Sequence, residues 1–160
     1  MSLWRHARAV LLLPFTATVV VPGLILWWTA ETNVWWGSAV GVVLMAVGLV
    51  FVAWTIRLFS TVGHGTLAPW DPTARLVVRG PYLHVRNPMI SGVAFVLVGE
   101  AISLGSKALL VWFAGFVAVN AVYIPLAEEP GLRRRFGQDY EAYRTNVPRW
   151  LPRLRAWEPT

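Results

Sequence analysis

The sequence contains no cysteine, and this absence excludes several kinds of site. Without cysteine there is no disulfide framework, no thiolate metal site and no cysteine nucleophile. The three histidines, His6, His64 and His84, are scattered along the chain and lack the spacing of a zinc site. The sequence therefore predicts no metal site.

Charge is also scarce. Charged residues make up 14% of the 160 residues, whereas an average soluble domain has roughly 25%. Hydrophobic residues make up 56%, and the mean hydropathy is +0.54. A water-soluble fold of this size could not bury so much apolar surface, so the composition indicates an integral membrane protein with a single domain over residues 1–160.

The basic residues outnumber the acidic ones and give a net charge of +6, and all but one of the 14 are arginine. They flank the apolar stretches of the chain. This arrangement is typical of positive-inside topology and of contact with anionic membrane lipids, and it does not favour a nucleic-acid partner.

Four apolar stretches are each long enough for a helix that crosses a hydrocarbon core of roughly 30 Å. They lie near residues 9–30, 34–56, 87–106 and 108–127, and only the third contains an acidic residue, Glu100. The first stretch is too long for a signal peptide and lacks a clear cleavage site. The sequence thus predicts an all-α membrane protein with about four transmembrane helices and a polar tail over residues 128–160.

The arginines predict the orientation of these helices. Arg5 and Arg8 precede the first stretch, four arginines lie in residues 57–86, and seven follow residue 127. We therefore expect both termini and the second loop on the cytoplasmic side of the plasma (inner) membrane. Four tryptophans, typical of an interfacial belt, flank the first outer loop: Trp27, Trp28, Trp35 and Trp36.

The second loop and the tail differ in their patterns. Glycine and proline occur at six positions of the loop and exclude a continuous helix there: Gly63, Gly65, Pro69, Pro72, Gly80 and Pro81. Residues 131–146 instead place four apolar side chains on one helical face: Leu132, Phe136, Tyr140 and Tyr143. We expect an amphipathic helix that lies on the membrane or on the second loop.

The first of three polar groups is the segment from Arg79 to Pro88. Pro88 suits the first turn of the third helix, where its missing N–H costs little. Arg86 and Asn87 would then lie at a helix N-terminus, a position that favours anions. The alternative is a simple positive-inside anchor, which explains the arginines but not the Gly-Pro-Tyr and Asn-Pro motifs.

The second polar group is the pair Glu128 and Glu129, directly after the fourth apolar stretch. Adjacent carboxylates repel each other and need cationic partners. The partner could be a ligand ammonium group, or alternatively an arginine such as Arg133 or Arg79.

The third polar group lies inside the apolar stretches. Glu100 is 12 residues past Pro88, which is roughly 18 Å along a helix and far from the cytoplasmic motifs. A packing carboxylate is favoured there over a functional one. For Asn120 a hydrogen bond between helices is favoured over a role in ligand binding.

Several motifs occur in a fixed order along the second half of the chain. They are LVVRGPY at 76–82, RNP at 86–88, EEPGL at 128–132, FGQDYEAY at 136–143 and VPRWLP at 147–152. This ordered set, which covers about half of the chain, resembles the isoprenylcysteine carboxyl methyltransferase family and, more loosely, phospholipid N-methyltransferases.

The resemblance implies S-adenosylmethionine as cofactor, bound on the cytoplasmic side between the last helices and the tail. It implies that one wall of the cofactor site is formed by Gly80, Pro81, Tyr82, Arg86, Asn87 and Pro88. It also implies that Glu128 or Glu129 faces the methionine ammonium, and it makes Arg86 and Glu129 the candidate catalytic residues. Family members commonly have histidine in place of Asn87 and tyrosine in place of Ile90, so these departures concern the substrate more than the cofactor.

We therefore expect a methyltransferase that acts on a lipid-like or other hydrophobic acceptor, which enters laterally from the bilayer. Methyl transfer from a sulfonium requires alignment of the reactants and exclusion of water more than acid–base chemistry. One alternative is a nicotinamide-dependent membrane reductase, although no G-x-G-x-x-G fingerprint is present. Another is a non-enzymatic assembly or transport protein. The acceptor (isoprenylcysteine, phosphatidylethanolamine, a thiol or a small hydrophobic acid) and the oligomeric state are left open.

Overall fold

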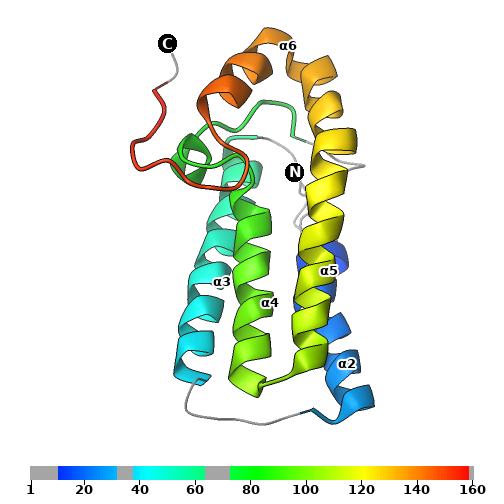
Figure 1. Ribbon diagram of the computed structural model, residues 1–160. Coiled ribbons are helices and arrows are strands. Elements are labelled where there is room, and N and C mark those ends of the chain that lie inside the picture. Colours follow the sequence, from blue (N-terminus) through cyan, green and yellow to red (C-terminus); the bar gives the residue numbers. More distant parts are fainter. Residues whose placement is uncertain (1–10, 32–37, 64–72, 159–160) are drawn as a thin grey trace.

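Figure 1 shows a computed structural model, which describes residues 11–31, 38–63 and 73–158. These residues form helices and connecting segments, with no strand among them, and the predicted all-α class is confirmed to that extent. Some residues discussed above lie outside the described ranges: Arg5, His6, Arg8, Trp35, Trp36, His64, Gly65, Pro69 and Pro72.

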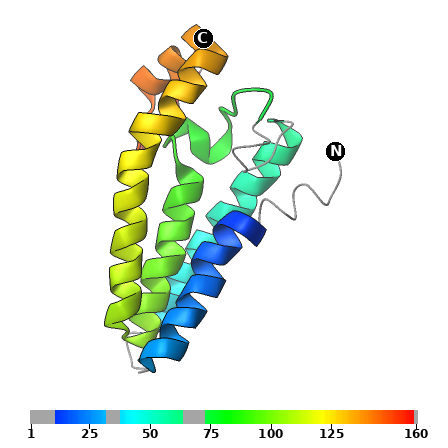
Figure 2. The same cartoon turned by 90° about the vertical axis from the view of Figure 1, so that its right-hand side faces the viewer.

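The body of the molecule is a set of helices that stand side by side (Figure 1). Helices α3 (Ser38–Thr61), α4 (Pro88–Leu104) and α5 (Lys107–Tyr123) alternate in direction. The π-helical segment η1 (Leu11–Val20) continues into α2 (Val21–Thr29), and together they lean across the bundle and contact α4 and α5 (Figure 2).

In the described part of the chain, two helices are long and apolar enough to cross a membrane: Ser38–Thr61 and the continuous helix Lys107–Asn146. Two further apolar helices, Pro14–Thr29 and Pro88–Leu104, are shorter. Large apolar side chains such as Val50 and Val111 are exposed along the helices. A surface of this kind suits lipid better than water.

Helices α3 and α4 pack so closely that their backbones touch. A Cβ atom added to Gly48 would lie 2.5 Å from the carbonyl oxygen of Gly92, and one added to Gly99 would lie 2.6 Å from that of Gly41. Small residues permit this approach, as in other membrane helix pairs. The contact fixes the start of α4 beside the end of α3.

Helix α5 does not end at the expected boundary of the fourth span. It continues through a π-helical turn, η3 (Ile124–Glu128), into α6 (Glu129–Asn146). The expected separate helix over residues 131–146 is therefore the end of a longer one. Pro125 and Pro130 are tolerated because the wider π turn relieves the clash and the lost hydrogen bond that proline causes in an α-helix.

The chain reverses direction above the bundle at Gly137, whose φ of 53° and ψ of −124° break the helical path within α6. The second half of α6 then lies over the bundle, together with the 3-10 helix η2 (Gly80–Leu83) and the tail at residues 147–158 (Figure 1). We call these three segments the head. Its core consists of Tyr140, Tyr143 and Val147, against which side chains of α6 and the second loop pack: Leu132, Phe136, Leu76 and Val78.

Candidate functional site

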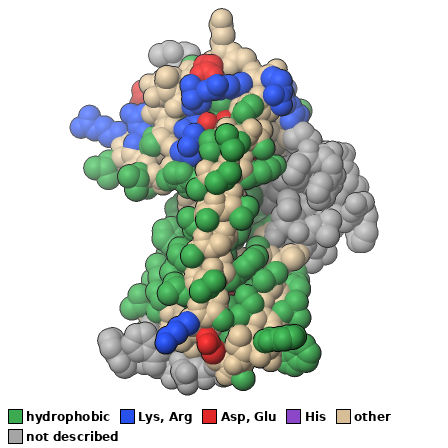
Figure 3. All heavy atoms as spheres, turned by 45° about the vertical axis from the view of Figure 1, so that its right-hand side comes forward, with side chains coloured by type: hydrophobic (Ala, Val, Ile, Leu, Met, Phe, Trp, Pro, Cys, Tyr) green, Lys and Arg blue, Asp and Glu red, His purple; other side chains and the backbone are tan. Residues whose placement is uncertain are grey.

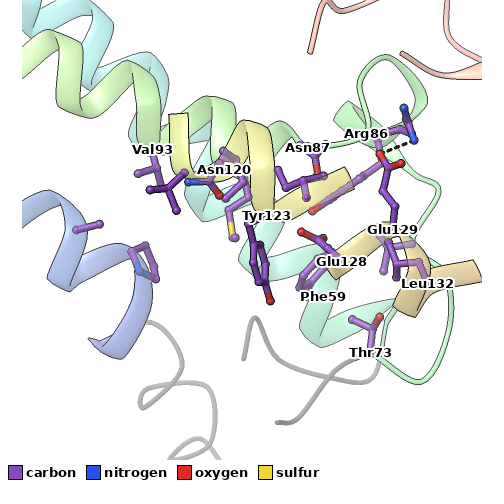
Figure 4. A pocket seen from close by; sticks show the side chains of 18 of the residues that line it. Phe59, Thr73, Arg86, Asn87, Val93, Asn120, Tyr123, Glu128, Glu129 and Leu132 are labelled. Carbon is purple, nitrogen blue, oxygen red and sulfur yellow. Dashed lines mark hydrogen bonds and ion pairs between the residues drawn. The ribbon is translucent and has the colours of Figure 1, made fainter. Parts of the chain in front are cut away.

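Arg86 links the start of α4 to the head. Helix α4 begins at Pro88, as predicted, so Arg86 lies just before its N-terminus. The Arg86 side chain is only 10% exposed, and its Nη1 donates a hydrogen bond of 2.9 Å to Glu129 Oε1 on α6 (Figure 4). Its Nε is buried and has no hydrogen-bond partner among the described residues. Arg86 therefore keeps an unused donor beside an ion pair.

Two arginines from different segments donate hydrogen bonds to Glu129. Besides Arg86, Arg149 in the tail donates from Nε to Oε1 at 2.7 Å and from Nη2 to Oε2 at 2.9 Å. Burial raises the pKa of Glu129, whose side chain is 6% exposed, but the hydrogen bonds from Arg149 and the charge of Arg86 outweigh it and lower the pKa. Glu129 is thus a fixed, ionised carboxylate. Arg133, one of the partners considered from the sequence, pairs instead with Glu141 at 2.7 Å.

The surroundings of Glu128 differ from those of Glu129. Its side chain points into a cavity below the head (Figure 4), and no described residue forms a hydrogen bond or an ion pair with it. Glu128 is exposed through the opening of the cavity, and partial desolvation there, together with the charge of Glu129, raises its pKa. The two adjacent carboxylates, both expected at the cofactor site, therefore differ in their contacts: Glu129, the candidate catalytic residue, accepts hydrogen bonds from two arginines, whereas Glu128 has no partner among the described residues.

The cavity has a volume of about 600 Å³ and lies between η1, α3, α4, α5 and α6. At the head it is lined by polar side chains: Arg86, Asn87, Glu128, Glu129 and Tyr140. Deeper in the bundle it is lined by apolar ones: Val93, Trp112, Phe116, Ala17 and Val21. One hollow therefore offers a charged end and an apolar end, which suits a charged ligand beside an apolar one.

The structure brings most of the residues expected at a cofactor site to this cavity. Its lining includes Tyr82, Arg86, Asn87, Glu128 and Glu129. The side chain of Asn87 also donates to the Arg149 carbonyl oxygen at 3.4 Å. Tyr82 stacks on Phe59 with ring centroids 5.8 Å apart, and both rings face the cavity.

Three other expected residues do not belong to the described lining: Gly80, Pro81 and Pro88. They shape the backbone instead. Gly80 has a φ of +57°, and a Cβ there would lie 2.9 Å from the Trp54 ring, so η2 can pack on α3 only with glycine at this position. The hydroxyl of Tyr143 donates to the Tyr82 carbonyl oxygen at 2.8 Å and holds η2 against α6.

Sequence reasoning missed the part that Arg149 plays. Arg149 lies within the VPRWLP motif, but nothing in the sequence connects it with Glu129, 20 residues earlier. The prediction for Asn120 is wrong: its Nδ2 donates to the Phe116 carbonyl of its own helix at 2.8 Å, and it lines the cavity. Glu100 lies away from the described cavity lining, and its Oε2 is buried without a hydrogen-bond partner among the described residues.

Apolar helices beneath an arginine-rich head, with a cavity that is charged at one end, define a helical membrane protein with a small-molecule site. The model of the phospholipid methyltransferase family matches residues 36–139, well over half of the chain. The chain therefore belongs to the phospholipid methyltransferase family, in agreement with the resemblance seen in its motifs. Membership indicates a membrane protein with methyltransferase activity. Searches of curated proteins and of solved structures gave no match.

Proposed function

We propose that this protein is a membrane S-adenosylmethionine-dependent methyltransferase that methylates a lipid-like or other hydrophobic small molecule. The cofactor occupies the charged end of the cavity, at the cytoplasmic face. The observation that carries the proposal is that one cavity combines a carboxylate, Glu128, which has no partner among the described residues, with apolar walls that include Val93 and Phe116.

The charged end fits the amino-acid part of the cofactor. An ammonium group needs an available carboxylate. Glu128 has no partner among the described residues, whereas Glu129 already accepts hydrogen bonds from two arginines. A carboxylate needs a cationic donor, and Arg86 is a cationic residue that lines the cavity. The volume of about 600 Å³ lies within the range of roughly 300–1,000 Å³ that is common for ligand sites.

Bound S-adenosylmethionine supplies a methyl group on a positively charged sulfur, which is already activated for transfer. The protein has to hold the two reactants in line and keep water away. Arg86 and Glu128 would fix the cofactor from two sides. The rings of Tyr82 and Phe59, stacked at 5.8 Å, would close the cavity beside them.

The apolar end fits the acceptor. Val93, Trp112 and Phe116 line the cavity within the bundle, where a hydrophobic molecule arriving from the bilayer would remain out of water. In this proposal the acceptor lies below the cofactor, toward the lipid, and the cofactor lies near the cytoplasm.

The proposed membrane placement has four crossing helices and both termini in the cytoplasm. Basic side chains support it, because they gather at the head end of the molecule (Figure 3). At the other end of the bundle α5 begins at Lys107, and Glu31 accepts a hydrogen bond from Ala108 N. Helix α4 has 17 residues and is roughly 26 Å long, which suits a slightly thin hydrocarbon layer.

The test is methyl transfer to extractable lipid. Purified protein is incubated with S-adenosylmethionine that carries tritium in its methyl group, together with a membrane lipid extract. We expect label in the organic phase, suppressed by S-adenosylhomocysteine and lost in Glu128→Gln. Label that never enters a hydrophobic molecule, with protein that does bind the cofactor, would contradict a lipid-like acceptor.

A further inference from the structure

The tail at residues 147–158 is an ordered part of the head. Three backbone hydrogen bonds tie it to the segment before α4: Arg86 N to Pro148 O at 2.9 Å, Arg153 N to His84 O at 3.0 Å and Trp157 N to Leu83 O at 3.0 Å. The ring Nδ1 of His84 donates to the Arg153 carbonyl oxygen at 2.8 Å. The conformation of the tail is therefore fixed by the fold.

This fixed tail turns large apolar side chains outward. Leu154 is 99% exposed, Leu151 is 81% exposed and Trp150 is 36% exposed. Contact of such side chains with water is unfavourable by about 1.5–3 kcal/mol for each one that could be buried. Three exposed apolar side chains lie within five consecutive residues of this fixed tail. They indicate a surface that is covered by a membrane or by another molecule.

The position of Trp150 indicates which phase that is. Trp150 lines a shallow apolar groove with Ile90 and Ala94 of α4 and Phe113 and Val117 of α5. Ile90 and Ala94 belong to the first two turns of α4. The tail therefore reaches past the start of a proposed membrane helix, to the depth at which tryptophan is enriched in membrane proteins.

The charges of the tail fit the same surface. Arg153 and Arg155 flank Leu154, and the tail contains one acidic residue, Glu158. Figure 3 shows hydrophobic side chains along the lower edge of the head, on the side of the bundle, with arginines above them. Basic residues beside a membrane attract anionic lipid headgroups by about 1 kcal/mol each.

We propose that residues 150–155 are an interfacial anchor for the cytoplasmic leaflet. Trp150, Leu151 and Leu154 enter the lipid, and Arg153 and Arg155 contact anionic headgroups. The proposal rests on the membrane placement proposed above, but not on the cofactor. Because Arg149 directly precedes the anchor and donates to Glu129, the anchor is connected to the ion pairs beside the cavity. The anchor lies outside the region matched by the family model.

The absence of cysteine allows a direct test, since a single introduced cysteine can be labelled without background. Two single-cysteine variants, Leu151→Cys and Leu154→Cys, are each labelled with a nitroxide. Each labelled protein is placed in nanodiscs of phosphatidylcholine with or without phosphatidylglycerol. The accessibility of the label to oxygen, relative to a water-soluble nickel complex, reports its depth. Val50→Cys on α3 is the lipid-facing control, and Gln138→Cys on α6 is the aqueous control.

We expect both tail labels to favour oxygen, as Val50→Cys does, and to lie deeper when phosphatidylglycerol is present. Adding Arg155→Gln should reduce the increase in label depth that phosphatidylglycerol causes. Tail labels that behave like Gln138→Cys, while Val50→Cys is immersed, would overturn the anchor and leave the proposed function standing. A Val50→Cys label that is also aqueous would overturn the membrane placement and the anchor with it.

Discussion

Glu128 and Glu129 are neighbours in the sequence, yet their surroundings give them different tasks. Glu129 accepts hydrogen bonds from Arg86 and Arg149, and its lowered pKa keeps it ionised at neutral pH. The stability that this group contributes is present above its unfolded pKa and is lost only as the pH falls through its lower folded pKa. Glu128 has no such partners among the described residues, and partial desolvation raises its pKa.

This contrast predicts how cofactor binding depends on pH. Glu128 attracts an ammonium group only when it is ionised, so the affinity for S-adenosylhomocysteine should fall as the pH falls through the raised pKa of Glu128. The loss should reach up to about tenfold per pH unit and begin at a higher pH than an ordinary carboxyl would give. Calorimetric titrations from about pH 8 to pH 5 measure it. Glu128→Gln should bind weakly with little pH dependence, and a wild-type affinity with the same pH dependence as that of Glu128→Gln would contradict the role of Glu128.

Arg149 provides a second prediction, about stability. Arg149→Gln removes a two-point hydrogen bond from buried Glu129 and should lower stability by about 1–3 kcal/mol, or several degrees in the thermal midpoint. The matched control is Arg133→Gln. The side chains of Arg133 and Glu141 are 44% and 45% exposed, so their ion pair should contribute under about 1 kcal/mol to stability. Equal thermal midpoints for the two variants would show that Arg149 does not secure Glu129.

At the scale of the elements, the sequence predicted the start of α4 at Pro88, because proline acts locally. It did not predict that α5 continues into α6. Pro125 and Pro130 indicate a break, and only the π-helical turn at Ile124–Glu128 allows the helix to pass them. The ion pair of Glu129 with Arg149 depends on the reversal at Gly137, so no local pattern could reveal it.

The α3–α4 contact leads to a prediction at this scale. Gly48→Ala would place a Cβ atom 2.5 Å from the Gly92 carbonyl oxygen, so the helices must separate. We expect a loss of about 1–3 kcal/mol, as for other overpacked sites. Gly115→Ala on α5, where a Cβ meets nothing within 4 Å, should be neutral or stabilise by up to about 1 kcal/mol. Thermal midpoints in detergent compare the two variants, and a tolerated Gly48→Ala would contradict the close packing.

At the scale of the whole molecule, composition alone indicated a helical membrane protein, and the ordered motifs indicated its family. The arrangement of the site was less accessible to prediction. The cavity is formed by η1, α3, α4, α5 and α6, so its shape depends on the packing of the whole bundle. That Glu128 has no partner in the described part of the chain likewise depends on the fold, because Arg86 and Arg149 both pair with Glu129.

The orientation in the membrane is a prediction at this scale. Gln138→Cys on the head and Lys107→Cys at the other end of the bundle are both exposed. A membrane-impermeant maleimide added to intact cells should label Lys107→Cys and not Gln138→Cys, because the arginine-rich head should face the cytoplasm. In inverted vesicles the pattern should be reversed. Labelling of both positions from the same side would contradict the proposed topology.

The measurement that tests the central claim most directly is calorimetric titration of S-adenosylhomocysteine into the protein in lipid nanodiscs. The wild type should bind. Glu128→Gln should bind at least about tenfold more weakly, because it loses one charge-assisted hydrogen bond. Glu141→Gln, which removes a carboxylate on the surface of the head, should bind like the wild type. Failure of the folded wild type to bind, or equal binding by Glu128→Gln, would contradict a cofactor site in this cavity.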